Sequence, residues 1–130
     1  MRDYLFDTNC ILRFLLRDNL PQASIIKQYF QNAKDGKVKI HIPILAFVEA
    51  VFILTRLYHF QKADVIEKLT TLAELTYIEI EKRSLLISAL SIYGKANISI
   101  VDSIFMVEAR QTGKELLTFD KRLKQLKITE

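Results

Sequence analysis

The chain has 130 residues, a length that suits one domain with a core of its own. Apolar residues make up 50% and charged residues 26%, a composition typical of a globular rather than a disordered protein. The formal net charge of +4 permits contact with a polyanion such as nucleic acid without requiring it. The single cysteine, Cys10, excludes an internal disulfide, and with only two histidines a Cys/His zinc cluster is disfavoured.

Neither a secretory signal nor a membrane span is expected. Asp3 and Asp7 interrupt the stretch in which the apolar core of a signal peptide would form. The longest apolar run, residues 42–54, is too short to cross a bilayer and contains Glu49. Together with the low cysteine content, this pattern predicts a cytoplasmic protein.

Short apolar runs alternate with longer amphipathic segments along the whole chain. In chain order we expect a strand at residues 4–6, helices at 9–18 and 20–36, a strand at 38–42, helices at 44–58 and 62–75, a strand at 76–80, helices at 83–97 and 99–113, a strand at 115–119 and a short edge strand within 124–130. Strands that alternate with helices indicate an α/β fold with a mainly parallel sheet covered on both faces. No linker or repeat divides the sequence, so one domain over residues 1–130 is expected.

Two aspartates follow predicted strands. Asp7 comes after residues 4–6 and Asp120 after residues 115–119. Ligands of an α/β sheet gather beyond the carboxyl ends of its strands, so both carboxylates would lie at one edge if these strands are parallel. The alternative is that each aspartate caps the helix or turn that follows it, because aspartate is a favoured N-cap.

Glu49 stands in a nearly all-apolar helix. Its neighbours one turn away are Leu45, Ala46, Phe52 and Ile53, and none of them is a cation. A charge on so apolar a helix is costly unless another group satisfies it, which makes Glu49 a candidate site residue. The alternative is that Glu49 points outward at the edge of the helix.

Asp102 repeats this pattern, with Ile98, Phe105 and Met106 one turn away. Here the alternative is a capping box, with Ser99 as the N-cap and Asp102 at the third helical position. A cap and a site residue can be the same side chain, so both interpretations stay open.

If Asp7, Glu49, Asp102 and Asp120 converge, their charges need a cation. Two carboxylates about 5 Å apart repel by roughly 3 kcal/mol at an effective dielectric constant of 20. Oxygen ligands without histidine or cysteine suit Mg²⁺ or Mn²⁺. Such an ion can activate water and stabilise displacement at phosphorus. The chain has only three glycines and no glycine-rich phosphate loop, which disfavours nucleotide binding of that kind.

The ordered set "YLFDTNCIL", "LAFVEAVFIL", "ISIVDSIFMVEAR" and "LLTFDKRL" resembles the PIN-domain ribonucleases, and among them the small toxins of VapBC-type toxin–antitoxin pairs. The resemblance implies a three-layer α/β/α fold with a mainly parallel five-stranded sheet, and metal-dependent endonucleolytic cleavage of RNA. By the same resemblance, Asp7, Glu49 and Asp102 take the places of the principal acids, and Asp120 that of a fourth, more variable one. Asn9 and Thr118 match supporting polar positions.

The resemblance also implies partners: an RNA substrate, a second copy of the chain in a homodimer, and a small cognate antitoxin that blocks the site. Basic side chains could neutralise the RNA backbone, and the candidates are Arg13, Arg17, Lys121 and Arg122. The alternative for each is a solvated surface charge.

Other functions fit the sequence less well. A solitary PIN-domain nuclease of RNA processing would carry the same acids. A magnesium-binding receiver domain of a signalling relay needs an acid pair at the first strand and an aspartate after a central strand, and the chain has neither. A haloacid dehalogenase-type phosphatase needs a second carboxylate where Asn9 stands.

Overall fold

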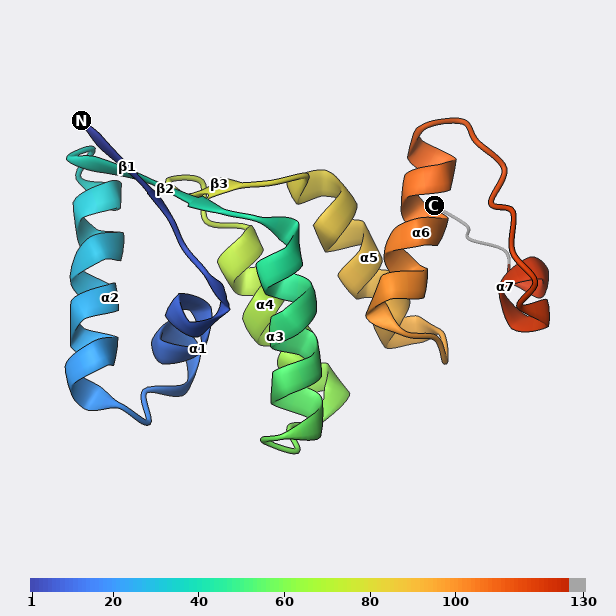
Figure 1. Cartoon of the computed structure of the whole chain (residues 1–130), viewed down its shortest axis with the longest axis horizontal. Helices are drawn as coiled ribbons and strands as arrows, with labels where there is room; N and C mark the ends of the chain where they lie inside the picture. Colours follow the sequence, from blue (N-terminus) through green and yellow to red (C-terminus); the bar gives the residue numbers. More distant parts are fainter. Residues whose placement is uncertain (127–130) are drawn as a thin grey trace. The chain divides into compact units, whose positions relative to one another are not determined.

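The computed structural model describes residues 1–126. The chain forms two compact units, Met1–Arg83 and Ser84–Glu130, which we call the N-terminal and C-terminal units and describe separately (Figure 1). The prediction of one domain over residues 1–130 therefore stays a prediction.

The predicted helices are all present. The elements in chain order are β1 (Arg2–Leu5), α1 (Thr8–Leu16), α2 (Leu20–Lys34), β2 (Val38–Ile42), α3 (Ile44–Arg56), α4 (Lys62–Ala73), β3 (Glu79–Ile80), α5 (Arg83–Lys95), α6 (Ile100–Gln111) and α7 (Lys121–Gln125). Across residues 1–126, no helix is long and apolar enough to cross a lipid bilayer.

The sheet is parallel, as predicted, with the strand order β1-β2-β3. Strand β1 pairs with β2 from Arg2 opposite Val38 to Leu5 opposite His41, and β2 pairs with the short β3. The backbone N–H of Phe6 donates to the carbonyl of His41 at 2.9 Å, which carries the pairing one residue beyond β1. The α/β class is therefore confirmed, with every paired strand in the N-terminal unit.

The predicted number of strands is wrong for the described residues, which contain three strands rather than five. Residues 115–119 form no strand, and Leu117 and Phe119 are 90% and 94% exposed. An isolated extended segment gains no ladder hydrogen bonds, so hydrophobic spacing alone does not make it a strand. Of the expected edge strand in 124–130, Lys124 and Gln125 belong to α7, and 127–130 lie outside the described residues.

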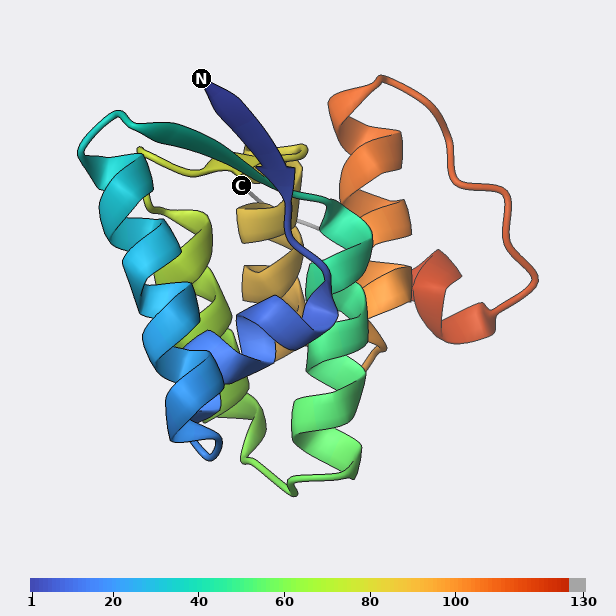
Figure 2. The ribbon, with the colours of Figure 1, turned by 60° about the vertical axis from the view of Figure 1, so that its left-hand side comes forward.

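One face of the sheet builds the core of the N-terminal unit. Ile40, Ile42 and Ile80 are buried on that face, and α1–α4 lie on the same side of the sheet (Figure 2). Leu5 on the other face is 74% exposed. This unit by itself has two layers, so the three-layer arrangement that the resemblance implies is not present within residues 1–83.

Aromatic packing holds the turn from β1 into α1. The ring of Phe6 meets Phe30 of α2 edge-on, with the ring centroids 5.7 Å apart, and Phe30 stacks on Phe14 of α1 at 4.2 Å. Such pairs add about 0.5–1.5 kcal/mol each to the burial of the rings. Because Phe6 is tied both to α2 and to β2, the residue that follows it, Asp7, has a defined place at the start of α1.

The start of α3 is capped from a distance. Pro43, at the N-cap position, supplies no side-chain hydrogen bond, and the free N–H of Ile44 instead donates to Oε1 of Glu81 at 2.9 Å. Glu81 follows β3, so its carboxylate joins the end of that strand to the helix that carries Glu49. A negative charge there also interacts favourably with the positive end of the helix dipole.

In the C-terminal unit, Ile98, Met106 and Leu123 form a buried cluster, and α6 and α7 pack through it. Leu116 and Leu126 cover this cluster in part. The cluster holds the short helix α7, and with it Asp120, against α6.

We predict that Glu81→Ala lowers the free energy of unfolding by about 0.5–2 kcal/mol, the usual cost of losing an N-cap acceptor. Glu81→Gln keeps an acceptor oxygen and should lose less. Urea unfolding measures both, with Glu67→Ala on the exposed side of α4 as the matched control. If Glu81→Ala is as stable as Glu67→Ala, the cap does not hold α3.

Candidate functional site

Asp7 is the N-cap of α1. Its backbone is extended, and its Oδ1 accepts a hydrogen bond from the N–H of Cys10 at 3.1 Å. The capping interpretation is thus confirmed, and the side chain is also exposed. A cap uses one carboxylate oxygen, which leaves the other oxygen of Asp7 available to a ligand.

Cys10 and Asn9 surround Asp7 in the first turn of α1. Burial raises the pKa of the Cys10 thiol, and its hydrogen bond with the Asp7 carboxylate raises it further. A thiol held in the protonated form is a poor nucleophile. Asn9 is exposed beside it, so its amide is accessible as a supporting polar group.

Glu49 lies on the exposed side of α3. The burial argument made for it from the sequence is therefore wrong, and the alternative of an outward-pointing helix edge is correct. Within residues 1–126 no hydrogen bond or ion pair to its carboxylate is found. Helix α1 packs against α3, and it begins beside α3 in Figures 1 and 2, so Asp7 and Glu49 belong to neighbouring elements of one unit.

Asp102 lies in the first turn of α6. Its backbone N–H donates to Oγ of Ser99 at 3.0 Å, which confirms Ser99 as the N-cap. The side chain of Asp102 is half-buried. A carboxylate in the first turn interacts favourably with the positive end of the helix dipole.

Asp120 is the N-cap of α7. Its Oδ1 accepts from the backbone N–H of Arg122 at 2.8 Å, and its Oδ2 is 3.3 Å from Nη2 of the same arginine. The hydrogen bonds and charge of Arg122 hold the pKa of the Asp120 carboxyl below its usual range. Thr118 supports the turn, because its hydroxyl oxygen accepts from the N–H of Asp120 at 3.1 Å.

Arg122 connects the two acids of the C-terminal unit. Asp120 raises the pKa of the Arg122 guanidinium, and the charge of Asp102 adds to this effect. Arg122 also donates to the carbonyl of Asn97 at 3.5 Å. The guanidinium is therefore paired with Asp120, and Asp102 adds a smaller electrostatic interaction.

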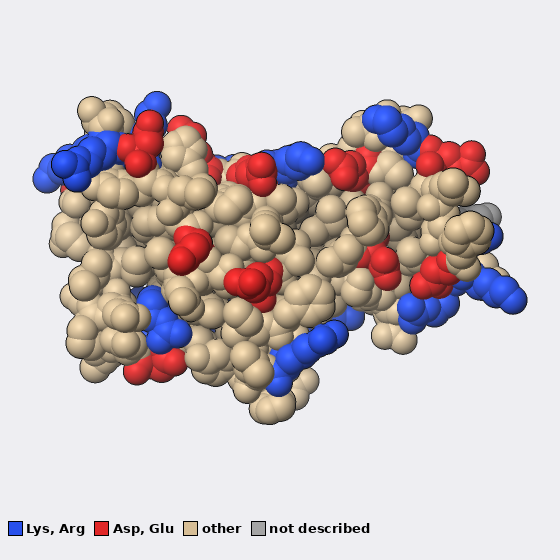
Figure 3. Space-filling view, viewed as in Figure 1, with Lys and Arg blue, Asp and Glu red and all other residues tan. Residues whose placement is uncertain are grey.

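The four basic candidates for RNA contact divide into two kinds. Arg13 forms an ion pair with Asp18 at 2.8 Å, and Arg122 is held by Asp120, so both are already neutralised locally. Arg17 and Lys121 are exposed, and no ion pair to either is found in the described part of the chain. Figure 3 shows acidic and basic side chains mixed on the face that it draws, so RNA contact there would depend on a few cations.

The donor chemistry of the acids fits a hard divalent cation, because all four offer carboxylate oxygens. The thiol beside Asp7, that of Cys10, has a raised pKa, which disfavours the thiolate form that binds metals. Two of the four acids, Asp7 and Glu49, belong to the N-terminal unit and the other two to the C-terminal unit. Among residues 1–126 no group of three or more His, Cys, Asp or Glu side chains forms a metal-binding cluster. The convergence of the four acids therefore stays a prediction.

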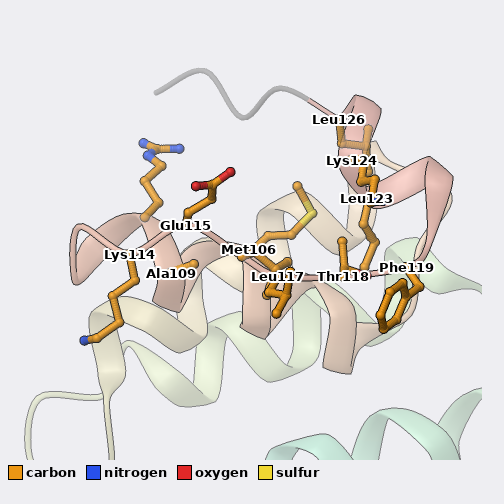
Figure 4. A pocket seen from close by; sticks show the side chains of 12 residues that line it. Met106, Ala109, Lys114, Glu115, Leu117, Thr118, Phe119, Leu123, Lys124 and Leu126 are labelled. Carbon is orange, nitrogen blue, oxygen red and sulfur yellow. The ribbon is translucent and has the colours of Figure 1, made fainter.

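A groove of about 850 Å³ lies in the C-terminal unit behind residues 114–119 (Figure 4). Met106, Leu123 and Leu126 line it, together with Lys114 and Lys124. Asp102 and Asp120 do not line this groove, although Thr118 and Phe119, which precede Asp120, do.

The structure shows two features of α3 that the sequence did not predict. Glu81, which follows β3, caps the N-terminus of α3. Phe52 is half-buried, and the guanidinium carbon of Arg56 lies 5.0 Å from its ring centroid. The spacing of Glu49, Phe52 and Arg56 along one helix face was the signal that could have found this pair.

Two comparisons with known proteins give a match over nearly the whole chain. The sequence model of the PIN domain matches residues 4–128, a range that includes all four candidate acids and extends over both units. The VapC ribonuclease of Aquifex aeolicus (strain VF5) is 26% identical over 123 residues, which cover 94% of this chain and 90% of the relative. No solved structure gives a significant match.

We predict that Arg122→Gln raises the pKa of the Asp120 carboxyl toward its ordinary value, because both a charge and a side-chain hydrogen bond are lost. Asp120 should then take up its proton at a higher pH than in the wild type. Carbon-detected NMR of the side-chain carboxyls measures this titration. Lys121→Gln is the matched control, and an equal shift in that variant would contradict the assignment to Arg122.

Proposed function

The chain belongs to the PIN-domain family, and on this premise we propose that it is a metal-dependent endoribonuclease that hydrolyses RNA phosphodiester bonds. The likeness to a protein named VapC ribonuclease supports this activity and, within it, the role of a toxin in a toxin–antitoxin pair. The observation that carries the proposal is the set of four acids inside the matched range, each with carboxylate oxygens accessible to a ligand.

In this proposal the four acids hold Mg²⁺ or Mn²⁺. Asp7 and Asp102 would bind the ion most directly, and Glu49 and Asp120 would complete its shell or hold its water molecules. A divalent ion so bound lowers the pKa of water and stabilises the charge that develops on the phosphate. Glu49 is suited to this role, because its carboxylate lies exposed without a partner in the described residues.

The other residues of the site act through these four. Ser99 and Thr118 fix the backbone next to Asp102 and Asp120 through the hydrogen bonds that they accept. Asn9 offers an amide in the same helical turn as Asp7. Arg17 and Lys121 are the cations that we propose for the RNA backbone, because Arg13 and Arg122 are engaged by carboxylates.

Arg122 has a second consequence for the proposal. A cation that enters beside Asp102 and Asp120 competes with a guanidinium that is already there. An ion held by Asp120 would therefore have to share this carboxylate with Arg122 or displace the guanidinium. Because Arg122 holds the pKa of the Asp120 carboxyl below its usual range, this acid is ionised at neutral pH, the form that binds a cation.

The family and the named relative also support partners for this chain. We propose that a cognate antitoxin binds this chain and blocks the acids. We also propose that the chain forms a homodimer and is located in the cytoplasm. A solitary PIN-domain nuclease of RNA processing is the second candidate, and a short reading frame for a DNA-binding protein immediately upstream would favour the toxin over it. The family assignment replaces the receiver-type signalling alternative.

We predict that the pure protein cleaves RNA in Mg²⁺ or Mn²⁺ and not in EDTA. Asp7→Asn and Asp102→Asn should each lower the cleavage activity more than the roughly 10- to 100-fold that is lost when a group hydrogen-bonded to a metal ligand is removed. Asp64→Asn, at the exposed start of α4, is the control and should keep wild-type activity. Circular dichroism checks that all variants fold. Cleavage that survives EDTA and both substitutions would exclude the metal–carboxylate mechanism.

A further inference from the structure

Helix α3 presents an exposed stripe that contains Glu49. The residues of the stripe follow one another at spacings of four, three and four along one helix face, and they are Leu45, Glu49, Phe52 and Arg56. Leu45 is 72% exposed, and Arg56 is exposed as well. An aromatic ring and a guanidinium are therefore the next side chains beyond the candidate catalytic carboxylate on this surface.

Phe52 and Arg56 are arranged as a pair. The guanidinium carbon lies over the phenyl ring, 5.0 Å from its centroid, which is the geometry of a cation–π contact. The ring itself is half-buried, so the helix holds it while part of it stays accessible. Aromatic rings and arginine planes are the two side-chain surfaces on which proteins stack unpaired RNA bases.

We infer that Phe52 and Arg56 form a stacking platform for one unpaired base of the RNA substrate, next to the phosphate that is cut. This inference rests on the proposed ribonuclease function and names the substrate feature that the site takes, a single-stranded nucleotide. The base stacks against the ring or the guanidinium, and the positive charge of Arg56 attracts the adjoining phosphate. A base inside a duplex has no free face for such a contact.

A protein that covered Leu45 and Phe52 would also take Glu49 out of water, and removing an unpaired carboxylate from water is costly. No cation pairs with that carboxylate in the described residues, so a protein partner, the proposed antitoxin included, would have to bring a cation of its own. RNA binding with a divalent ion meets the same requirement, because the ion would balance Glu49 while the base covers the apolar surface. The pair of Phe52 and Arg56 favours RNA here, because a ring and a guanidinium plane both stack on unpaired bases.

The test uses an RNA oligonucleotide that the wild-type protein cleaves in Mg²⁺, and it measures the KM and kcat of cleavage. Phe52→Leu should raise KM at least about fivefold, the low end of what one base–aromatic stack contributes, with a smaller change in kcat. Phe52→Tyr should restore the wild-type KM, because a ring is restored. Phe60→Leu is the matched control, since Phe60 also has a cation near its ring, Lys68 Nζ at 6.0 Å, but lies beyond the end of α3.

A series of the same RNA with one base removed at each position in turn locates the stacked base. At one position, removal of the base should raise the KM of the wild-type protein as much as the Phe52→Leu substitution does. The same removal should not raise the KM of the Phe52→Leu variant any further. If Phe52→Leu does not fold, Arg56→Gln carries the test, because an exposed polar replacement should raise KM without unfolding the helix.

The two proposals fail in different ways. If the wild-type protein cleaves no RNA, the proposed function fails. If the wild type cleaves RNA but neither Phe52→Leu nor Arg56→Gln raises KM, the platform is overturned and the function stands. A change in sedimentation or antitoxin binding with an unchanged KM also overturns it, because the stripe is then a protein interface.

Discussion

The start of a helix stabilises negative charge through its free backbone N–H groups and its dipole, and three of the four candidate acids lie at such a start. Asp7 accepts from the N–H of Cys10, and Asp120 from the N–H and guanidinium of Arg122. Asp102 stands in the first turn of α6, within the field of Arg122. Glu49 has no such partner within residues 1–126. In the proposed function a bound divalent cation would be the partner of this exposed carboxylate.

Contacts within each unit place these acids. Asp7 is held in place because the preceding residue, Phe6, packs on Phe30 of α2 and pairs with β2. These two contacts fix the position at which α1 begins. Glu49 is held because Glu81 caps the helix that carries it. Each of these contacts lies within the N-terminal unit, and the cluster around Leu123 does the same for α7 in the C-terminal unit. The carboxylates are thus positioned by helix starts and caps, and loops contribute little.

Hydrophobic periodicity and capping preferences along the sequence predicted most of the helices and several helix starts. The helices and the parallel strand at 38–42 follow from periodicity, and Ser99 and Asp7 follow from capping preferences. Contacts between distant residues were harder to predict, because they depend on which neighbour the folded chain supplies. Residues 115–119 have strand spacing without a partner strand, and Glu49 lies on the exposed side of a helix whose composition suggested burial. The ion pair between Arg122 and Asp120 could not be predicted from the sequence, since a charged side chain two residues away can as easily point to solvent.

The central claim is that acids of both units bind one metal site. Mn²⁺ added below stoichiometry to ¹⁵N-labelled protein tests it directly, because a paramagnetic ion broadens the amide signals of the residues close to it. The account predicts that broadening appears together around Asp7 and Glu49 in the N-terminal unit and around Asp102 and Asp120 in the C-terminal unit, and that Asp7→Asn weakens both sets. Broadening confined to one unit, or left unchanged by Asp7→Asn, would contradict a shared site.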